Sequence, residues 1–189
     1  MSTKKIILAV GSALAISSVA QFAMANSGKI DFEGGISATT CDVNIAGKGP
    51  NATITLPTVS ANLLKKSGDV AGQTRIPFKL LNCTVAQNPT YAKVFFTAAN
   101  ANVNPAGRLD IDGTVTGPAS GVDLQILGSD HKAIDLTQDI LGQSNTRSQI
   151  TGAAGAGTAD IEYFVQYYAT TASAAGRVKS SVSYEIHYE

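Results

Sequence analysis

The sequence contains few of the side chains that usually perform catalysis or bind metals. It has two cysteines, Cys41 and Cys83, and two histidines, His131 and His187. Neither histidine has a cysteine or carboxylate partner at the spacing of a metal-binding motif. The sequence also lacks the glycine-rich phosphate-binding loop, the dinucleotide-binding fingerprint and the nucleophile motif of serine hydrolases. We therefore expect no catalytic residue, no metal site and no cofactor, and we expect that the protein is not an enzyme.

The first 25 residues predict an export signal. Lysines at positions 4 and 5 give a cationic start, an apolar run covers residues 6–20, and an Ala-x-Ala triplet follows at residues 23–25. This order is typical of a secretory signal peptide. The run is rich in Gly and Ser and is shorter than the roughly 20 residues of a membrane span. We predict cleavage after Ala25, with cleavage after Ala20 as the alternative.

The two cysteines take their meaning from this export signal. An exported chain folds in an oxidising compartment, where an even number of cysteines usually forms disulfides. Cys41 and Cys83 lie 83 − 41 = 42 residues apart, and closing a loop of that length stabilises a fold by roughly 4 kcal/mol in the chain-entropy model. We predict a Cys41–Cys83 disulfide, and a pair of buried free thiols is the alternative.

The elements that must position these residues are short strands. The chain of 189 residues is 44% hydrophobic and 15% charged, and its 14 basic residues equal its 14 acidic residues, so composition gives no support to nucleic-acid binding. Alternating or β-prone segments, separated by Gly, Pro and Asn turn signals, occur at residues 28–38, 41–45, 52–56, 76–83, 91–98, 122–127, 161–168 and 178–188. Seven or eight short strands without a convincing helix predict a β-sandwich.

Three of these segments allow finer predictions. Residues 161–168 are apolar on both faces, so this strand should be central in its sheet. Residues 178–188 have one apolar and one polar face, so one side should be packed and the other wet. Pro77 predicts that residues 76–83 form an edge strand or that a strand starts there. The tyrosines of the last two strands could belong to a sugar-stacking patch, but we favour the core for them.

Residues 28–38 form a distinctive alternating segment close to the first cysteine. Ile30, Phe32, Gly34 and Ile36 fall on one face, and charged residues at positions 29, 31 and 33 fall on the other. The pattern alone permits two interpretations. The segment is either the first strand of a complete domain or an arm that packs elsewhere.

Together, three features carry a resemblance to a known family. They are the alternating arm with Gly34 ahead of Cys41, the cysteine pair about forty residues apart, and a last strand with Tyr188 as the penultimate residue and Gly176 fourteenth from the end. In this order behind a signal peptide, they resemble the pilins of chaperone–usher fimbriae, such as the type 1 and P pilus families. The resemblance covers essentially the whole mature chain.

The resemblance implies a fold and a domain organisation. The fold class would be all-β, an incomplete immunoglobulin-like β-sandwich (the pilin fold) with an N-terminal donor-strand arm. Residues 1–25 would be the signal peptide, residues 26–38 the donor-strand extension, and residues 39–189 the pilin immunoglobulin-like domain. The arm would act through Ile30, Phe32, Gly34 and Ile36. The C-terminal strand that borders the chaperone and the acceptor groove would contain Gly176, Val178, Val182, Tyr184, Ile186 and Tyr188.

The resemblance also implies a function and partners. The chain would be a structural subunit of a bacterial surface fimbria that supports cell adhesion and polymerises by donor-strand exchange. It would pass through the periplasm to the cell surface, with a periplasmic pilus chaperone, an outer-membrane usher and neighbouring pilin subunits as partners. A host receptor would be contacted through the assembled fimbria, and no nucleic acid is expected. The alternative is a minor adaptor or a tip-associated adhesive subunit of the same fimbria.

Overall fold

The computed structural model describes residues 29–32, 36, 38–84, 90–99 and 102–189. The chain divides into two compact units, Met1–Gly35 and Ile36–Glu189. The predicted signal peptide and Gly34 lie outside the described residues. In the first unit, residues 29–32 belong to no helix or strand, and the side chains of Ile30 and Phe32 are 77% and 90% exposed.

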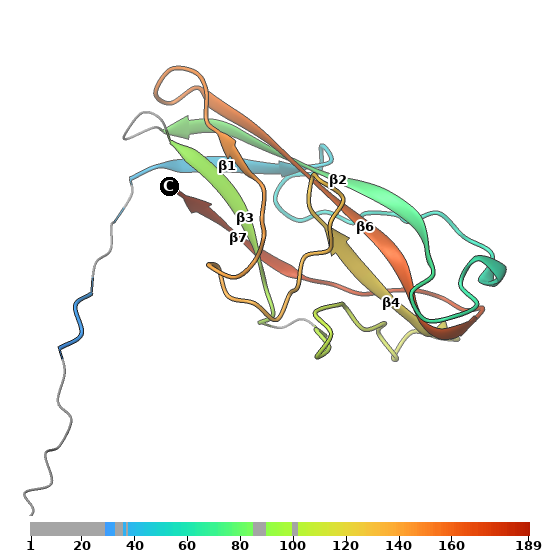
Figure 1. The fold of residues 1–189 in the computed structure, drawn as a ribbon. Coiled ribbons are helices and arrows are strands. Elements are labelled where there is room, and N and C mark those ends of the chain that lie inside the picture. The colour runs from blue at the N-terminus through green and yellow to red at the C-terminus, as the bar shows by residue number, and fades with distance from the viewer. Residues whose placement is uncertain (1–28, 33–35, 37, 85–89, 100–101) are drawn as a thin grey trace, which may run out of the picture. The chain divides into compact units, whose positions relative to one another are not determined.

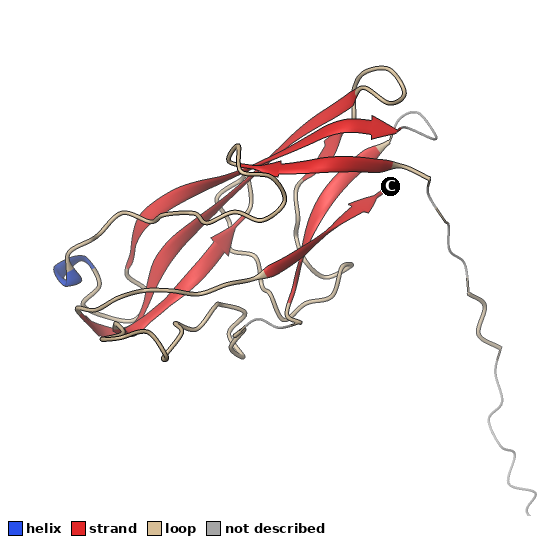
Figure 2. Ribbon diagram, turned by 180° about the vertical axis from the view of Figure 1, so that it is seen from behind, coloured by secondary structure: helices blue, strands red, loops and turns tan. Residues whose placement is uncertain are grey.

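The described residues of the second unit form seven strands in two antiparallel sheets (Figures 1 and 2). The four-stranded sheet has the order β1-β2-β6-β4. The three-stranded sheet has the order β5-β3-β7. In chain order, the strands are β1 (Thr40–Ile45), β2 (Val70–Thr84), β3 (Tyr91–Thr97), β4 (Ser120–Leu127), β5 (Arg147–Gln149), β6 (Gly157–Ala174) and β7 (Ser183–Tyr188). The described chain contains one helical element, a single 3₁₀ turn called η1 (Ala61–Leu63), so the all-β prediction is confirmed.

The core lies between the sheets, around the long strand β6. The prediction that residues 161–168 are central is confirmed, because β6 lies between β2 and β4. Its inward residues, Tyr163 among them, are buried, and its outward residues between 162 and 170 are half-covered. The Tyr163 ring meets Phe96 of the other sheet edge-to-face at 5.0 Å between centroids and Phe78 at 5.8 Å. Tyr163 and Tyr167 therefore belong to the core, as favoured from the sequence.

Pro77 does not mark an edge strand or a strand start, so that prediction was wrong. It lies in the interior of β2, which has β1 on one side and β6 on the other. The Pro77 carbonyl accepts a hydrogen bond from the Ala46 N–H, one residue beyond the end of β1. In an antiparallel strand the nitrogen and the carbonyl of a residue point to the same side, so the Pro77 nitrogen also faces this place beyond β1. The pairing of β1 with β2 has already ended there, so the missing N–H costs no ladder hydrogen bond.

Two other strand edges are covered by segments that are not strands themselves. Along the outer edge of β4, Leu109 and Leu124 exchange two main-chain hydrogen bonds of 2.9 Å, and Ile134 donates to Ile126. Beside β3, the buried Gln143 side chain both donates to and accepts from the main chain of Phe96, at 2.7 and 3.2 Å. Such covering matters because an unpaired edge is a template for pairing with another chain.

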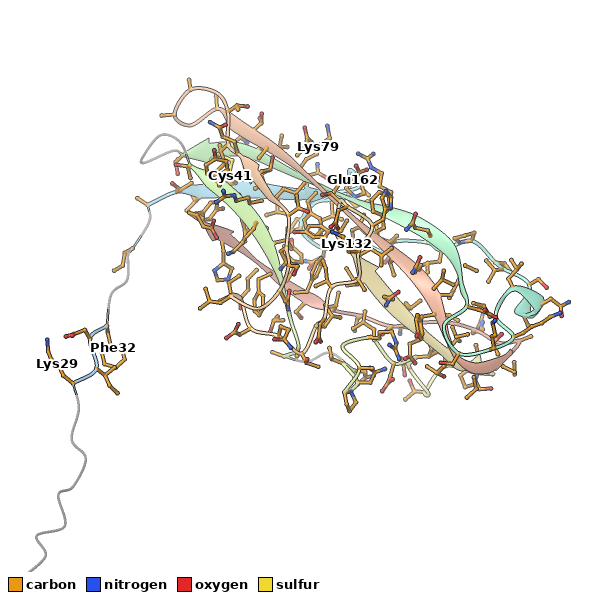
Figure 3. The ribbon with its side chains drawn as sticks, viewed as in Figure 1. Lys29, Phe32, Cys41, Lys79, Lys132 and Glu162 are labelled. Atoms are coloured by element: carbon orange, nitrogen blue, oxygen red, sulfur yellow. A yellow bond between two sulfur atoms is a disulfide. The ribbon has the colours of Figure 1, made fainter. Side chains whose placement is uncertain are left out.

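A disulfide joins the first two strands. Cys41 of β1, labelled in Figure 3, is bonded to Cys83 of β2, so the predicted pairing is confirmed. The half-cystine at position 83 is fully buried in the core. The bond therefore fastens the start of β1 to the interior strand that lies next to it.

The disulfide predicts a thiol count. The oxidised protein, denatured and treated with a thiol reagent, should show no titratable thiol, and reduction should lower its free energy of unfolding by roughly 4 kcal/mol. Mass spectrometry of the labelled protein with and without prior reduction measures the count. Two labelled thiols in the unreduced sample would contradict the pairing.

Tyr163 predicts a pH-dependent contribution to stability. Its hydroxyl is 3.2 Å from the Thr146 carbonyl and 3.4 Å from the Val94 carbonyl, and burial raises its pKa well above 10. We expect Tyr163→Phe to cost about 1 kcal/mol at pH 7. Because the folded-state pKa is raised, this advantage of the wild type is full below about pH 10, where the unfolded chain begins to ionise, and is lost as the pH rises further. Urea unfolding at pH 7 and pH 11 tests this; a cost that grows at pH 11 would contradict it.

Candidate functional site: an open groove beside the last strand

Strand β7 has one paired edge and one unpaired edge. It pairs with β3 from Thr97–Ser183 to Ala92–Tyr188, and just beyond, Tyr91 and Glu189 exchange two main-chain hydrogen bonds of 2.9 Å. In an antiparallel pair, hydrogen-bonded and non-hydrogen-bonded residues alternate. The residues whose main-chain groups point away from β3 are Tyr184, Ile186 and Tyr188. In the described chain, the N–H and C=O groups of these three residues have no hydrogen-bond partner.

The side chains beside this unpaired edge are apolar and only half-covered. They pack against the core but remain partly exposed, unlike the fully buried side chains of β6. They are Val178, Val182, Tyr184, Ile186 and Tyr188. The predicted strand at 178–188 is confirmed only from Ser183 onward, because the residues before it contact the segment at 110–119 through isolated main-chain bonds instead of a ladder.

A second apolar row lies across from β7, in residues 50–59, which we call the lip segment. This segment runs from the end of β1 to η1 (Figure 1). Ala52, Ile54, Leu56 and Val59 are half-buried against the core, and the residues between them are mostly exposed. No main-chain to main-chain hydrogen bond joins the lip segment to any described residue. The prediction of a strand at residues 52–56 was therefore wrong: the alternation is present, but the segment has no strand to pair with.

A cavity of about 400 Å³ deepens one end of this groove. Its lining comes from both sides, with Leu56 and Val59 from the lip segment and Val178 from the chain that leads into β7. Gly176 also lines it, and a Cβ atom there would lie 2.3 Å from the Ala119 amide nitrogen. Gly176 is therefore a place where the backbones pack too closely for any side chain.

Three tyrosine hydroxyls form hydrogen bonds around the groove, and that of Tyr184 joins β7 to the lip segment. The Tyr184 hydroxyl donates to the Pro50 carbonyl at 2.8 Å, and the Tyr167 hydroxyl donates to the Pro57 carbonyl at 3.2 Å. The Tyr188 hydroxyl accepts from the Cys41 N–H at 3.0 Å. A tyrosine hydroxyl is protonated at neutral pH, and burial raises the pKa of all three further.

The structure brings the six predicted residues of the C-terminal strand region to this groove, Gly176 and Val178 at its cavity, Val182 just before β7 and the other three on β7. Of the predicted arm residues, Ile30 and Phe32 lie in the first unit, while Ile36 begins the second unit and is fully exposed. Sequence reasoning missed the lip segment and Tyr167 as parts of the groove. The alternation at residues 52–56 was the available signal for the lip.

Nothing else in the described residues suggests a chemical centre. They contain no group of three or more His, Cys, Asp or Glu side chains that could hold a metal ion. The same residues contain no helix that is long and apolar enough to cross a membrane. The groove is therefore the candidate site, and its unpaired edge and apolar sides suit it to binding an extended peptide segment.

Known proteins similar to this chain are fimbrial proteins. A family model described as FimA, type-1 fimbrial protein A, matches residues 56–189. The chain is 36% identical over 166 residues to the major fimbrial subunit SMF-1 of Stenotrophomonas maltophilia, across 88% of this chain and 95% of that protein. It is 30% identical over 195 residues to a major fimbrial subunit of Haemophilus influenzae, across 89% of this chain and 90% of that protein.

Solved structures agree on the fold. The P pilus rod subunit PapA superposes with a TM-score of 0.55 at 16% identity, covering 79% of this chain and 99% of that chain. A chain from the structure of a chaperone–usher pilus gives a TM-score of 0.53 at 19% identity, covering 87% of this chain and 96% of that one. The family model, which matches most of the sequence, and the relative that is 36% identical show that the chain is a structural fimbrial subunit and belongs to the type-1 fimbrial protein family.

Proposed function

We propose that this fimbrial subunit polymerises by donor-strand exchange, in which the groove beside β7 accepts the arm of a neighbouring copy. The observation that carries the proposal is the unpaired edge of β7 above half-covered apolar side chains, with the unpaired lip segment opposite. A strand inserted there would pair with the main chain of Tyr184, Ile186 and Tyr188. Pilin subunits are a known example of this mode of recognition, in which main-chain pairing gives affinity and side-chain pockets give specificity.

The arm has the side chains that such a groove needs. Ile30, Phe32 and Ile36 are large apolar side chains at 77%, 90% and 105% exposure, on one face of an alternating segment. Full burial of each side chain would contribute ~1.5–3 kcal/mol before the cost of ordering the arm. Gly34 shares their face and would lie where the groove leaves no room for a side chain. The charged residues between them would keep the free arm soluble.

The proposal includes the route by which the subunit reaches the fimbria. Residues 1–25 would direct export and be removed, residues 26–38 would form the donor arm, and residues 39–189 would form the domain that carries the groove. In the periplasm a pilus chaperone would occupy the groove first, because an open apolar edge invites aggregation. An outer-membrane usher would then promote its exchange for the arm of the next subunit. Adhesion to a host surface would be a property of the assembled fimbria.

Deleting residues 26–37 tests whether this segment is a donor arm or the first strand of a complete domain. If the segment packs in another molecule, the shortened subunit should still form a soluble one-to-one complex with its chaperone, yet fail to enter a polymer as a donor. Gel filtration of the periplasmic complex and electron microscopy of surface fibres measure the two properties. Normal fibres from the shortened subunit would refute the donor role. Loss of both the chaperone complex and the fibres would favour a first strand of a complete domain.

Gly34→Leu tests the close approach within the groove. The added side chain should overpack the groove by ~1–3 kcal/mol, so that strand exchange slows or stops while the chaperone complex stays normal. Gly35→Leu is the matched control, since alternation places residue 35 on the opposite face of the arm. Polymer yield from purified chaperone–subunit complexes measures the effect. Equal yields from the two leucine variants would argue against a close-packed position at residue 34.

A further inference from the structure

The lip segment is attached to the domain by side chains and not by main-chain pairing. Its residues form no main-chain to main-chain hydrogen bond within the described chain. Instead, the carbonyl of Pro50 accepts the Tyr184 hydroxyl and the carbonyl of Pro57 accepts the Tyr167 hydroxyl. Between them, the Lys48 ammonium group donates to the Thr53 carbonyl at 3.2 Å. The lip is thus fastened near both ends by tyrosine hydroxyls.

The two hydroxyls reach the lip from different sheets. Tyr184 belongs to β7 in the three-stranded sheet, and Tyr167 belongs to β6 in the four-stranded sheet. Their acceptors are both proline carbonyls, at the two ends of the stretch 51–56. Because side chains make these attachments, the N–H groups between the prolines stay available for an incoming strand. Ladder pairing to the domain would hold the lip more firmly but would use up the groups that an incoming strand needs.

The side chain of Tyr184 also reaches from β7 across the groove to the lip. Neighbouring strands lie ~4.7–4.9 Å apart, so one strand between β7 and the lip requires the two sides to stand about 9–10 Å apart. A tyrosine side chain with its hydrogen bond bridges such a gap from below, since the ring packs on the core against Phe78 at 5.1 Å between centroids. The same bond would oppose both a collapse of the lip onto β7 and its movement away from β7.

We propose that Tyr184 and Tyr167 are positioning residues. Their hydroxyls hold the lip segment at a distance from β7 that leaves room for one inserted strand, so that the groove is preorganised to capture an arm. This inference rests on the proposed function. A preorganised groove binds without first paying for the ordering of its own walls. Without the hydroxyls, only a fraction of the subunits has the lip in place, and the apparent association is slowed by that fraction.

The test measures how fast the groove captures an arm. Full-length, secreted and oxidised subunit is mixed with an excess of a fluorescent synthetic peptide of residues 26–38, and association and dissociation rates are followed separately by fluorescence anisotropy. Tyr184→Phe and Tyr167→Phe should each slow association about three- to tenfold, as expected for the loss of one net hydrogen bond, with dissociation changed less than twofold. The dissociation rate should hold because the captured strand itself keeps the lip in place.

Tyr163→Phe is the matched control. It also removes a buried tyrosine hydroxyl, but that hydroxyl contacts carbonyls at Val94 and Thr146, away from the lip. Its association rate should equal that of the wild type although its thermal stability falls. If a tyrosine variant folds poorly, Lys48→Met offers a second test, because Lys48 is exposed and its ammonium group also bonds to the lip, at the Thr53 carbonyl. This variant should slow association about twofold.

The possible outcomes distinguish a failure of this inference from a failure of the proposed function. Wild-type subunit that captures no peptide would overturn the proposed function, and the inference with it. Capture by the wild type, with unchanged association rates in Tyr184→Phe and Tyr167→Phe, would overturn the inference alone. Equal slowing in Tyr163→Phe would do the same, because the effect would then follow general destabilisation and not the lip.

Discussion

The structure depends on an interaction that the folded domain leaves unmade, the pairing of the outer edge of β7. The main-chain groups of Tyr184, Ile186 and Tyr188 point away from β3 and find no partner in the described chain. The side chains of the same residues are only half-covered. An extended strand would satisfy both needs at once, because a strand brings main-chain donors and acceptors together with side chains at a period of two.

Two other strand edges of the domain are covered, while the outer edge of β7 stays open. The outer edge of β4 is covered by Leu109 and Ile134, and the short strand β5 is extended by the side chain of Gln143. Each of these substitutes occupies groups that would otherwise attract another chain. The groove therefore differs from these two covered edges, because its unpaired main chain lies beside half-covered apolar side chains.

The interactions that hold the walls of the groove leave its main-chain hydrogen-bonding groups free. The disulfide fastens Cys41 to an interior strand, and the Cys41 N–H is in turn bonded to the Tyr188 hydroxyl at the end of β7. The hydrogen bonds of Tyr184 and Tyr167 to the lip come from their hydroxyls and not from their main chain. A site held in this way can stay open while its walls keep their positions, which suits the strand capture proposed above.

By itself, the sequence determined the strand periodicity, the central place of residues 161–168, the cysteine pair and the apolar face of the last strand. These follow from local rules: side chains alternate along a strand, an interior strand is apolar on both faces, and exported cysteines pair. The sequence could not determine which edges are paired. The alternation at residues 52–56 is real, yet the segment is a lip and not a strand, and Pro77 lies inside a sheet because β1 ends beside it. Only the tertiary structure decides such matters, since a period of two reports which face a residue occupies and not which neighbour its main chain meets. The same holds for the hydroxyls of Tyr184 and Tyr167, whose acceptors lie 134 and 110 residues away along the chain.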